Sequence, residues 1–146
     1  MPEAIFIKIM NLNTNKYETS LMVRPDDIDM NNHVHSSKYM DYVLFARYDQ
    51  MERCYKMSMD EFIKTGFTWV IKSTFIEYKR SLVLGETCHI FTWLESMEGN
   101  SCKVCFEIKK TNGKESCTGY FIYTMINANT GKSEKVPQWI IDRYSI

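Results

Sequence analysis

A polar turn that runs straight into an apolar helix decides how this chain folds. Residues 25–35 are PDDIDMNNHVH, and residues 36–56 are SSKYMDYVLFARYDQMERCYK. Proline, aspartate and asparagine in the first segment favour turns and non-helical backbone, and Ser36 or Ser37 is a good N-cap for a helix in the second. Apolar residues of this helix occupy more than one stripe. Such a helix is usually buried on several sides, so the rest of the chain should pack around it.

The sequence on either side of this helix is mostly typical of strands. A first strand is predicted at residues 17–24. After the helix, Ser58 and Glu61 form a capping box that should start a short helix, and Gly66 should end it. Asn112-Gly113 is a strong hairpin signal. Further strands are expected over residues 67–79, 87–95, 102–109 and 115–126.

This order of elements predicts a single α+β domain over residues 1–146. Strands and helices are segregated along the chain, as in that class. One sheet must cover one apolar helix, so the sheet should curl around it, with the last four strands as an antiparallel meander. A last helical turn is expected after Pro137. No repeat or linker divides the 146 residues, which are enough for one hydrophobic core.

Composition argues against several classes of partner. The formal net charge is zero, so no global field attracts nucleic acid. Apolar runs fall far short of the roughly 20 residues that span a bilayer. The N-terminus does not read as a secretory signal, because Lys8 interrupts the short apolar stretch after Glu3. We therefore expect no nucleic acid, no membrane association and a cytoplasmic location.

The five cysteines are expected to be reduced. An odd count without an export signal favours free thiols. Cys102 and Cys105 have the C-x-x-C spacing of redox and zinc sites. However, their segment alternates like a strand, and positions i and i+3 of a strand point to opposite faces. They are therefore interpreted as small apolar strand residues.

The densest polar cluster lies just before the long helix. Asp29, Asn31, His33 and His35 occupy every second position, so their side chains would share one face of an extended segment. A helix N-terminus offers unpaired N–H groups, which can hold a carbonyl oxygen as it becomes an oxyanion. A carboxylate can act as base or nucleophile, and an imidazole can move a proton. Those parts suit acyl transfer to water.

Two other interpretations of this cluster stay open. Asp and Asn side chains often cap backbone groups, so the segment can be a purely structural turn. His33 and His35 have a spacing that can grip zinc. No further cluster of ligands lies near them in the sequence, and the third histidine, His89, falls within a predicted strand. We therefore expect no metal and no cofactor.

Residues 27–34, followed by Tyr39, resemble the active-site segment of acyl-ACP thioesterases of the hotdog superfamily. The spacing from Asp29 to Tyr39 is also similar to that of the 4-hydroxybenzoyl-CoA thioesterase family. Residues 68–70 and 76–86 resemble the second strand of these enzymes and its Gly-acidic turn. Two departures are visible: His35-Ser36 replaces a pair of asparagines, and no acid stands near Ser81, where the plant enzymes use one.

The resemblance implies a hotdog fold, in which a curved antiparallel sheet wraps around a long central helix. It implies a homodimer or homotetramer with each site at a subunit interface. It also implies hydrolysis of acyl-CoA or acyl-ACP without a metal, in fatty acid metabolism. Asp29 would be the general base or nucleophile, Asn31 its neighbour, and His33 the supporting imidazole.

Three further residues are assigned to substrate binding. Tyr39 follows the motif in the helix, and Lys79 and Arg80 are cations suited to the phosphates of coenzyme A or phosphopantetheine.

Two rival functions remain open. A hotdog hydratase or dehydratase would act on similar substrates, but its usual motif carries a proline and one more residue. The second rival is a non-catalytic acyl-binding protein on the same scaffold. The acidic residue at position 29 argues against this rival.

Overall fold

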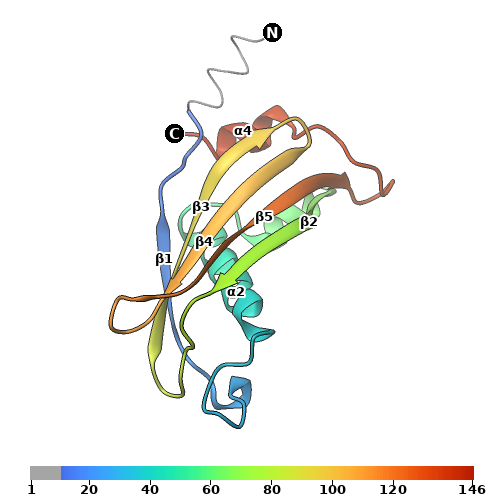
Figure 1. Ribbon diagram of the computed structural model, residues 1–146. Helices are drawn as coiled ribbons and strands as arrows, with labels where there is room; N and C mark the ends of the chain where they lie inside the picture. Colours follow the sequence, from blue (N-terminus) through green and yellow to red (C-terminus); the bar gives the residue numbers. More distant parts are fainter. Residues whose placement is uncertain (1–10) are drawn as a thin grey trace.

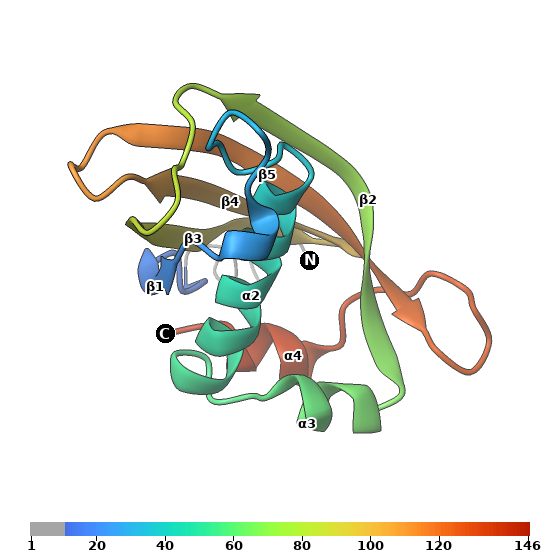
Figure 2. The ribbon, with the colours of Figure 1, turned by 90° about the horizontal axis from the view of Figure 1, so that it is seen from below.

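The computed structural model describes residues 11–146 and shows a curved antiparallel sheet around a long helix, α2 (Lys38–Arg53) (Figure 1). The sheet consists of β1 (Tyr17–Met22), β2 (Phe67–Tyr78), β3 (Thr87–Glu98), β4 (Ser101–Lys109) and β5 (Glu115–Asn127). Figure 2 shows α2 lying in the concave face of this sheet. The predicted α+β architecture, with one sheet curled around one helix, is therefore what the chain adopts.

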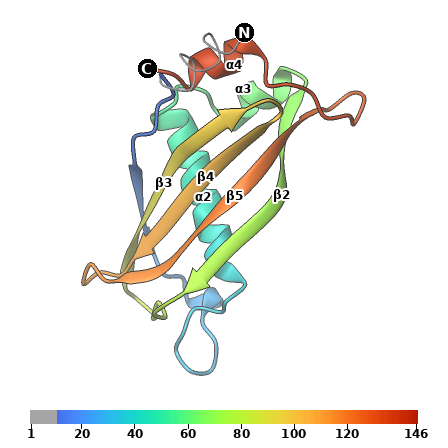
Figure 3. The same ribbon diagram turned by 45° about the horizontal axis from the view of Figure 1, so that its top comes forward.

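Within the described residues, three short helices accompany α2 and the sheet: η1 (Pro25–Asp27), α3 (Met59–Lys64) and α4 (Gln138–Arg143). The hydroxyl of Ser58 accepts a hydrogen bond from the Glu61 N–H at 3.2 Å, which confirms the predicted capping box. The helical turn expected after Pro137 is α4. Both α3 and α4 lie near the C-terminal end of α2 (Figures 2 and 3). Within residues 11–146, no helix is long and apolar enough to cross a membrane.

The predicted four-stranded meander is wrong in one respect. The strand order is β1-β3-β4-β5-β2, so β2 pairs with β5 and not with its successor β3. The chain therefore crosses the sheet through residues 79–86. Part of this crossover pairs with the loop before α2 instead of forming a hairpin, since the Val34 N–H donates to the Leu82 carbonyl at 2.9 Å. Strands β1 and β2 are left as the two edges.

Two buried clusters fill the space between α2 and the sheet. One packs on the first half of α2, around the fully buried Val43 and Ala46, and the other on its C-terminal end, around Met51. Strand β4 contributes one face to both through Cys102, Val104, Phe106 and Ile108, as predicted. All five cysteines are free thiols in the structure.

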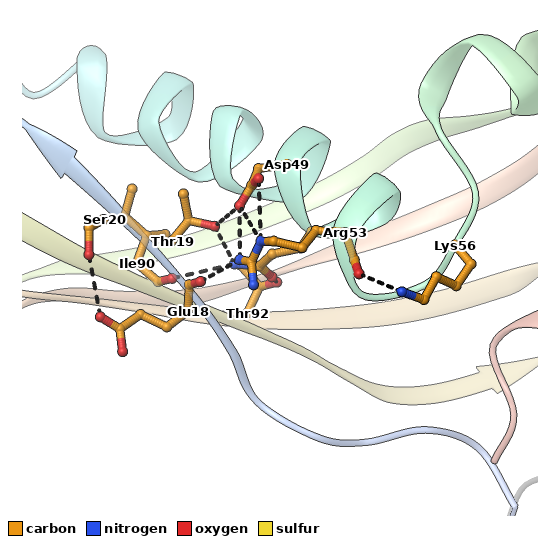
Figure 4. Close-up of polar contacts among 9 residues, drawn as sticks. Glu18, Thr19, Ser20, Asp49, Arg53, Lys56, Ile90 and Thr92 are labelled. Carbon is orange, nitrogen blue, oxygen red and sulfur yellow. Dashed lines mark hydrogen bonds and ion pairs between the residues drawn. The ribbon is translucent and has the colours of Figure 1, made fainter.

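A buried polar network ties α2 to the sheet. The Gln50 amide, fully buried, donates to the Thr19 hydroxyl at 3.1 Å and accepts from the Thr92 hydroxyl. The Thr19 hydroxyl donates in turn to Asp49 at 2.6 Å, and Arg53 forms an ion pair with the same carboxylate at 2.9 Å (Figure 4). These bonds fix the rotation of α2 against β1 and β3, and so determine which side of the helix faces the core.

Candidate active site

The motif before α2 forms a tight turn. The Asp29 N–H donates to the His33 carbonyl at 2.8 Å, and the Asn32 N–H donates back to the Asp29 carbonyl at 3.2 Å. Ile28 and Val34 pair at its base. Asn32 has a φ of 62°, a left-handed conformation that asparagine adopts more readily than most residues. The turn predicted from proline, aspartate and asparagine is therefore present, and because the segment is not extended, alternate residues do not share one strand face.

The Asp29 carboxylate holds this turn together. Its Oδ1 accepts hydrogen bonds from the backbone N–H groups of Asn31 at 2.8 Å and His33 at 3.1 Å. The bond from His33, then that from Asn31, lowers the pKa of Asp29 below its ordinary value. The Asp29 residue is partly exposed, and Oδ2 has no hydrogen-bond partner within residues 11–146. One oxygen is therefore structural, while the other is free to meet a reactant.

The turn is anchored to the crossover that follows β2. His33 pairs with Val83 in an isolated bridge, next to the bond between Val34 and Leu82. The Leu84 N–H also donates to the Asn32 side chain at 3.4 Å. Two segments that are about fifty residues apart in the sequence therefore fix the position of Asp29 jointly.

Tyr39, predicted to bind substrate, is buried beside this anchor. Its hydroxyl accepts a hydrogen bond from the Leu82 N–H at 3.0 Å. Its ring packs edge-on against Tyr78, with 5.3 Å between the ring centroids. The Tyr78 hydroxyl then donates to the Ser36 carbonyl at 3.0 Å. In one chain, Tyr39 thus positions the crossover against the start of α2.

Asp27 is a motif residue that the sequence analysis passed over. It is 8% exposed, and its Oδ2 accepts a hydrogen bond from the Tyr42 hydroxyl at 2.7 Å. Its carbonyl accepts from the His35 N–H at 2.8 Å. Burial, followed by the bond to Asp27, raises the pKa of Tyr42. Of the two acids in the Asp-x-Asp pair, Asp27 therefore ties the loop to α2, while Asp29 stays at the surface.

The remaining motif side chains diverge. Those of Asn31 and His33 are exposed and make no hydrogen bond within the described residues. Ser37 is the N-cap of α2, but its side chain makes no cap bond; its hydroxyl pairs with the His35 ring at 2.8 Å. Over residues 11–146, no group of three or more His, Cys, Asp or Glu side chains is placed to hold a metal ion.

Lys79 and Arg80 line a shallow depression next to Tyr39, of about 290 Å³. The Lys79 ammonium lies 2.8 Å from the Glu115 carboxylate, which raises the pKa of Lys79 and lowers that of Glu115. The Arg80 guanidinium donates to the Glu115 carbonyl at 3.2 Å. Both cations are exposed, and Tyr39, at the start of α2, lines the same depression.

A larger apolar pocket of about 410 Å³ lies along the C-terminal half of α2. Leu44, Arg47, Tyr48 and Met51 line it from the helix at spacings that share one face. Asp29, Asn31 and His33 are not among its lining residues. The sequence analysis did not identify this pocket, although the apolar residues beyond a single helical stripe were a signal for it.

The curved sheet, the central helix and the turn before it define a hotdog fold, and solved structures of thioesterases share it. DHNA-CoA thioesterase from Staphylococcus aureus is 20% identical, with a TM-score of 0.80 over 87% of this chain and 85% of that one. YbaW, a probable thioesterase from Escherichia coli, is 20% identical, with a TM-score of 0.76 over 86% and 94%. The 12:0-ACP thioesterase from Umbellularia californica is 14% identical, with a TM-score of 0.77 over 88% and 52%.

The chain matches the model of the thioesterase-like superfamily over residues 23–143, and it belongs to that family. A search of the curated proteins gave no match. Family membership confirms the predicted hotdog fold and the predicted class of enzyme, a thioesterase that hydrolyses an acyl thioester.

Proposed function

We propose that Asp29 drives the hydrolysis of an acyl thioester carried by coenzyme A or acyl carrier protein. The observation that supports this role is the geometry of its carboxylate. Two backbone N–H groups orient it and keep it ionised, while its second oxygen is free at the surface. A carboxylate held in this way needs no reorganisation before it meets a water molecule or a carbonyl carbon.

Two routes are compatible with this geometry. As a general base, Asp29 takes a proton from water, the water oxygen attacks the thioester carbonyl, and the C–S bond breaks to release a thiolate. As a nucleophile, Asp29 forms a mixed anhydride with loss of the thiolate, and water then hydrolyses the anhydride. The N–H groups at the start of α2 would polarise the carbonyl oxygen in either route, with Asn31 and His33 as polar neighbours.

The proposed carrier end of the site is the depression at Lys79 and Arg80. Both cations are exposed beside Tyr39, within reach of a phosphate. The names of two structural neighbours, one a DHNA-CoA and one a 12:0-ACP thioesterase, support either carrier. The proposal includes a cytoplasmic role in fatty acid metabolism, where such carriers are used.

The proposal also includes a second copy of the chain, as a homodimer or homotetramer. Asp29 and the apolar pocket do not meet within one chain, so a partner would complete the path between them. The edge strand β2 supports this, since Val70, Phe75 and Tyr78 are each about half exposed on it. Bare apolar edges of this length are usually covered.

Asp29→Asn tests the catalytic role. Asparagine keeps an acceptor oxygen for the N–H groups of residues 31 and 33 and removes only the charge, so the turn should persist. We expect kcat in a thiol-release assay to fall by at least about a hundredfold, with an unchanged Tm. Asp29→Ala is the matched control for the structural role, because it removes the acceptor too and should lower Tm. Near-wild-type turnover of folded Asp29→Asn would exclude Asp29 from the mechanism.

A further inference from the structure

Arg47 is a buried cation that the proposed chemistry does not use. It lines the apolar pocket and is only 9% exposed. Its Nη1 has no hydrogen-bond partner in the described residues, and no carboxylate there forms an ion pair with it. Its guanidinium carbon lies 5.8 Å from the centre of the Tyr55 ring. Burial of an unpaired charge is strongly unfavourable, so a compensating group is expected in the functional state.

The polar groups around Arg47 are also donors without acceptors. The hydroxyls of Tyr55 and Tyr144 are buried and donate to no acceptor in the described residues, while Arg47 beside Tyr55 and Trp69 beside Tyr144 are donors that act to lower the pKa values of these phenols. Burial raises the pKa of Tyr55 to about 12, against the opposing charge of Arg47, and it raises that of Tyr144 too. Both phenols are therefore neutral at neutral pH and keep their protons to donate. A cation beside neutral hydroxyls that lack acceptors is an arrangement suited to bind an anionic oxygen.

The rest of the pocket is suited to hydrocarbon. Met51, Leu94, Met97 and Trp69 line it, and Leu44, Tyr48 and Ile63, which are partly exposed, stand at its rim. Arg47 lies nine residues along α2 from Lys38, which corresponds to about 14 Å of helix. A carboxylate at Arg47 would therefore lie well away from the Asp29 turn of the same chain, and the partner subunit proposed above would complete the path of the acyl chain from a thioester to this pocket.

We propose that this pocket takes an acyl chain whose far end carries a carboxylate, with Arg47 as the specificity-determining residue. The substrates would then be half-thioesters of dicarboxylic acids. A guanidinium binds a carboxylate through two parallel hydrogen bonds, which would pair the buried charge. A methyl-ended chain would leave that charge unpaired, and sites with an unmet polar group discriminate strongly against such analogues. The inference rests on the proposed acyl thioester site.

The experiment compares matched substrates. Acyl-CoAs from hexanoyl to decanoyl and their ω-carboxy counterparts are assayed by thiol release, and the ratio of kcat/KM within each pair is measured. The wild type should favour the ω-carboxy member by at least about tenfold at one chain length. Arg47→Met should abolish or reverse the preference. Arg53→Met is the matched control: this arginine lies on the same helix, is exposed and pairs with Asp49 (Figure 4), so its loss should leave the ratio unchanged.

A second measurement separates this inference from the role of Asp29. Binding of non-hydrolysable thioether analogues of the same pairs to the wild-type protein, measured by calorimetry, requires no catalysis. Tighter binding of the ω-carboxy analogue would support the inference even if Asp29→Asn stayed active, or if Arg47→Met failed to fold. Equal or tighter binding of the methyl-ended analogue, or a preference for a hydroxyl-ended chain over the carboxylate-ended one, would overturn it.

Discussion

In the proposed mechanism, the carboxylate of Asp29 would set the acidic side of the pH dependence. Backbone hydrogen bonds from His33 and Asn31 stabilise its charged form, so its pKa lies below the ordinary value of 3.8. Because the pKa is lowered, the carboxylate stays ionised as pH falls toward that value and protonates only below it. We therefore expect the acidic limb of kcat/KM to lie below pH 3.8, with fluorescence used to verify that the protein is still folded. An acidic limb near neutral pH would mean that a partner subunit buries Asp29.

At this scale the sequence predicted a turn before the helix, and the chain forms one, while the catalytic role of its residues stays a prediction. Alternating polar residues suggested an extended face, whereas Asn32 turns the chain and Asp29 caps the turn. That outcome depends on pairing with the distant Leu82 and Val83, which local periodicity does not report. The sequence could have marked Arg47 as a candidate functional residue, because it is a single charge within the most apolar stretch of the helix.

The contact between α2 and β3 depends on a hydrogen bond from the Thr92 hydroxyl to Gln50, which is lost when a methyl group replaces that hydroxyl. In Thr92→Val, the buried Gln50 carbonyl oxygen loses its donor. An unsatisfied buried acceptor costs about 1–3 kcal/mol, and urea denaturation should show that loss in the free energy of unfolding. Thr118→Val, on β5, is the control because its hydroxyl makes no hydrogen bond in the described residues. Adding Gln50→Leu should cost less than the two single changes combined, and full additivity would contradict the coupling.

Strands β2 and β5 approach closely at Gly119. A Cβ atom there would lie 2.0 Å from the Phe75 carbonyl oxygen and 2.6 Å from the Phe106 ring. A backbone carbonyl cannot move aside as a flexible side chain can, so the added methyl group would clash with it. Gly119→Ala should therefore lower the free energy of unfolding by about 1–3 kcal/mol. A urea titration measures the change, with Thr118→Ala as the neighbouring control. An unfolding midpoint equal to that of the wild type would show that the strands do not approach as described.

At the scale of elements, local patterns carried most of the information. The capping box at Ser58, the hairpin at Asn112-Gly113 and the alternation in β4 each depend on residues near one another in sequence, and all three were confirmed. The partner of β2 was predicted wrongly, as β3 instead of β5, because a strand's periodicity shows which face is buried but not which neighbour it pairs with. Gly119 was the available signal, since a glycine within a strand often marks a close approach of backbone.

At the scale of the whole molecule, the two proposed functional regions lie apart. The Asp29 turn precedes α2, and the apolar pocket follows the C-terminal half of the helix. The separation of the turn from the pocket could not be predicted from local sequence, because it depends on how α2 lies across the sheet. A second subunit is the simplest way to complete such a site, since a two-fold interface places the same surface of both copies in contact.

The last prediction is that the protein is at least a homodimer and that β2 forms part of the interface. Strand β2 is a twelve-residue edge, on which Phe75 is 48% exposed and Val70 47%. Pairing with a second copy would satisfy its backbone and cover these side chains. Light scattering at micromolar concentration should give at least twice the 17.3 kDa of the chain.

Two variants locate the interface. Phe75→Glu should shift the protein toward monomer and lower its specific activity, because a charge would be buried against the partner without a counter-ion. Met22→Glu is the matched control: it introduces the same charge at an exposed apolar residue on β1, the opposite edge of the sheet, and should leave mass and activity unchanged. A fully active species of 17.3 kDa would refute both the dimer and a site shared between subunits.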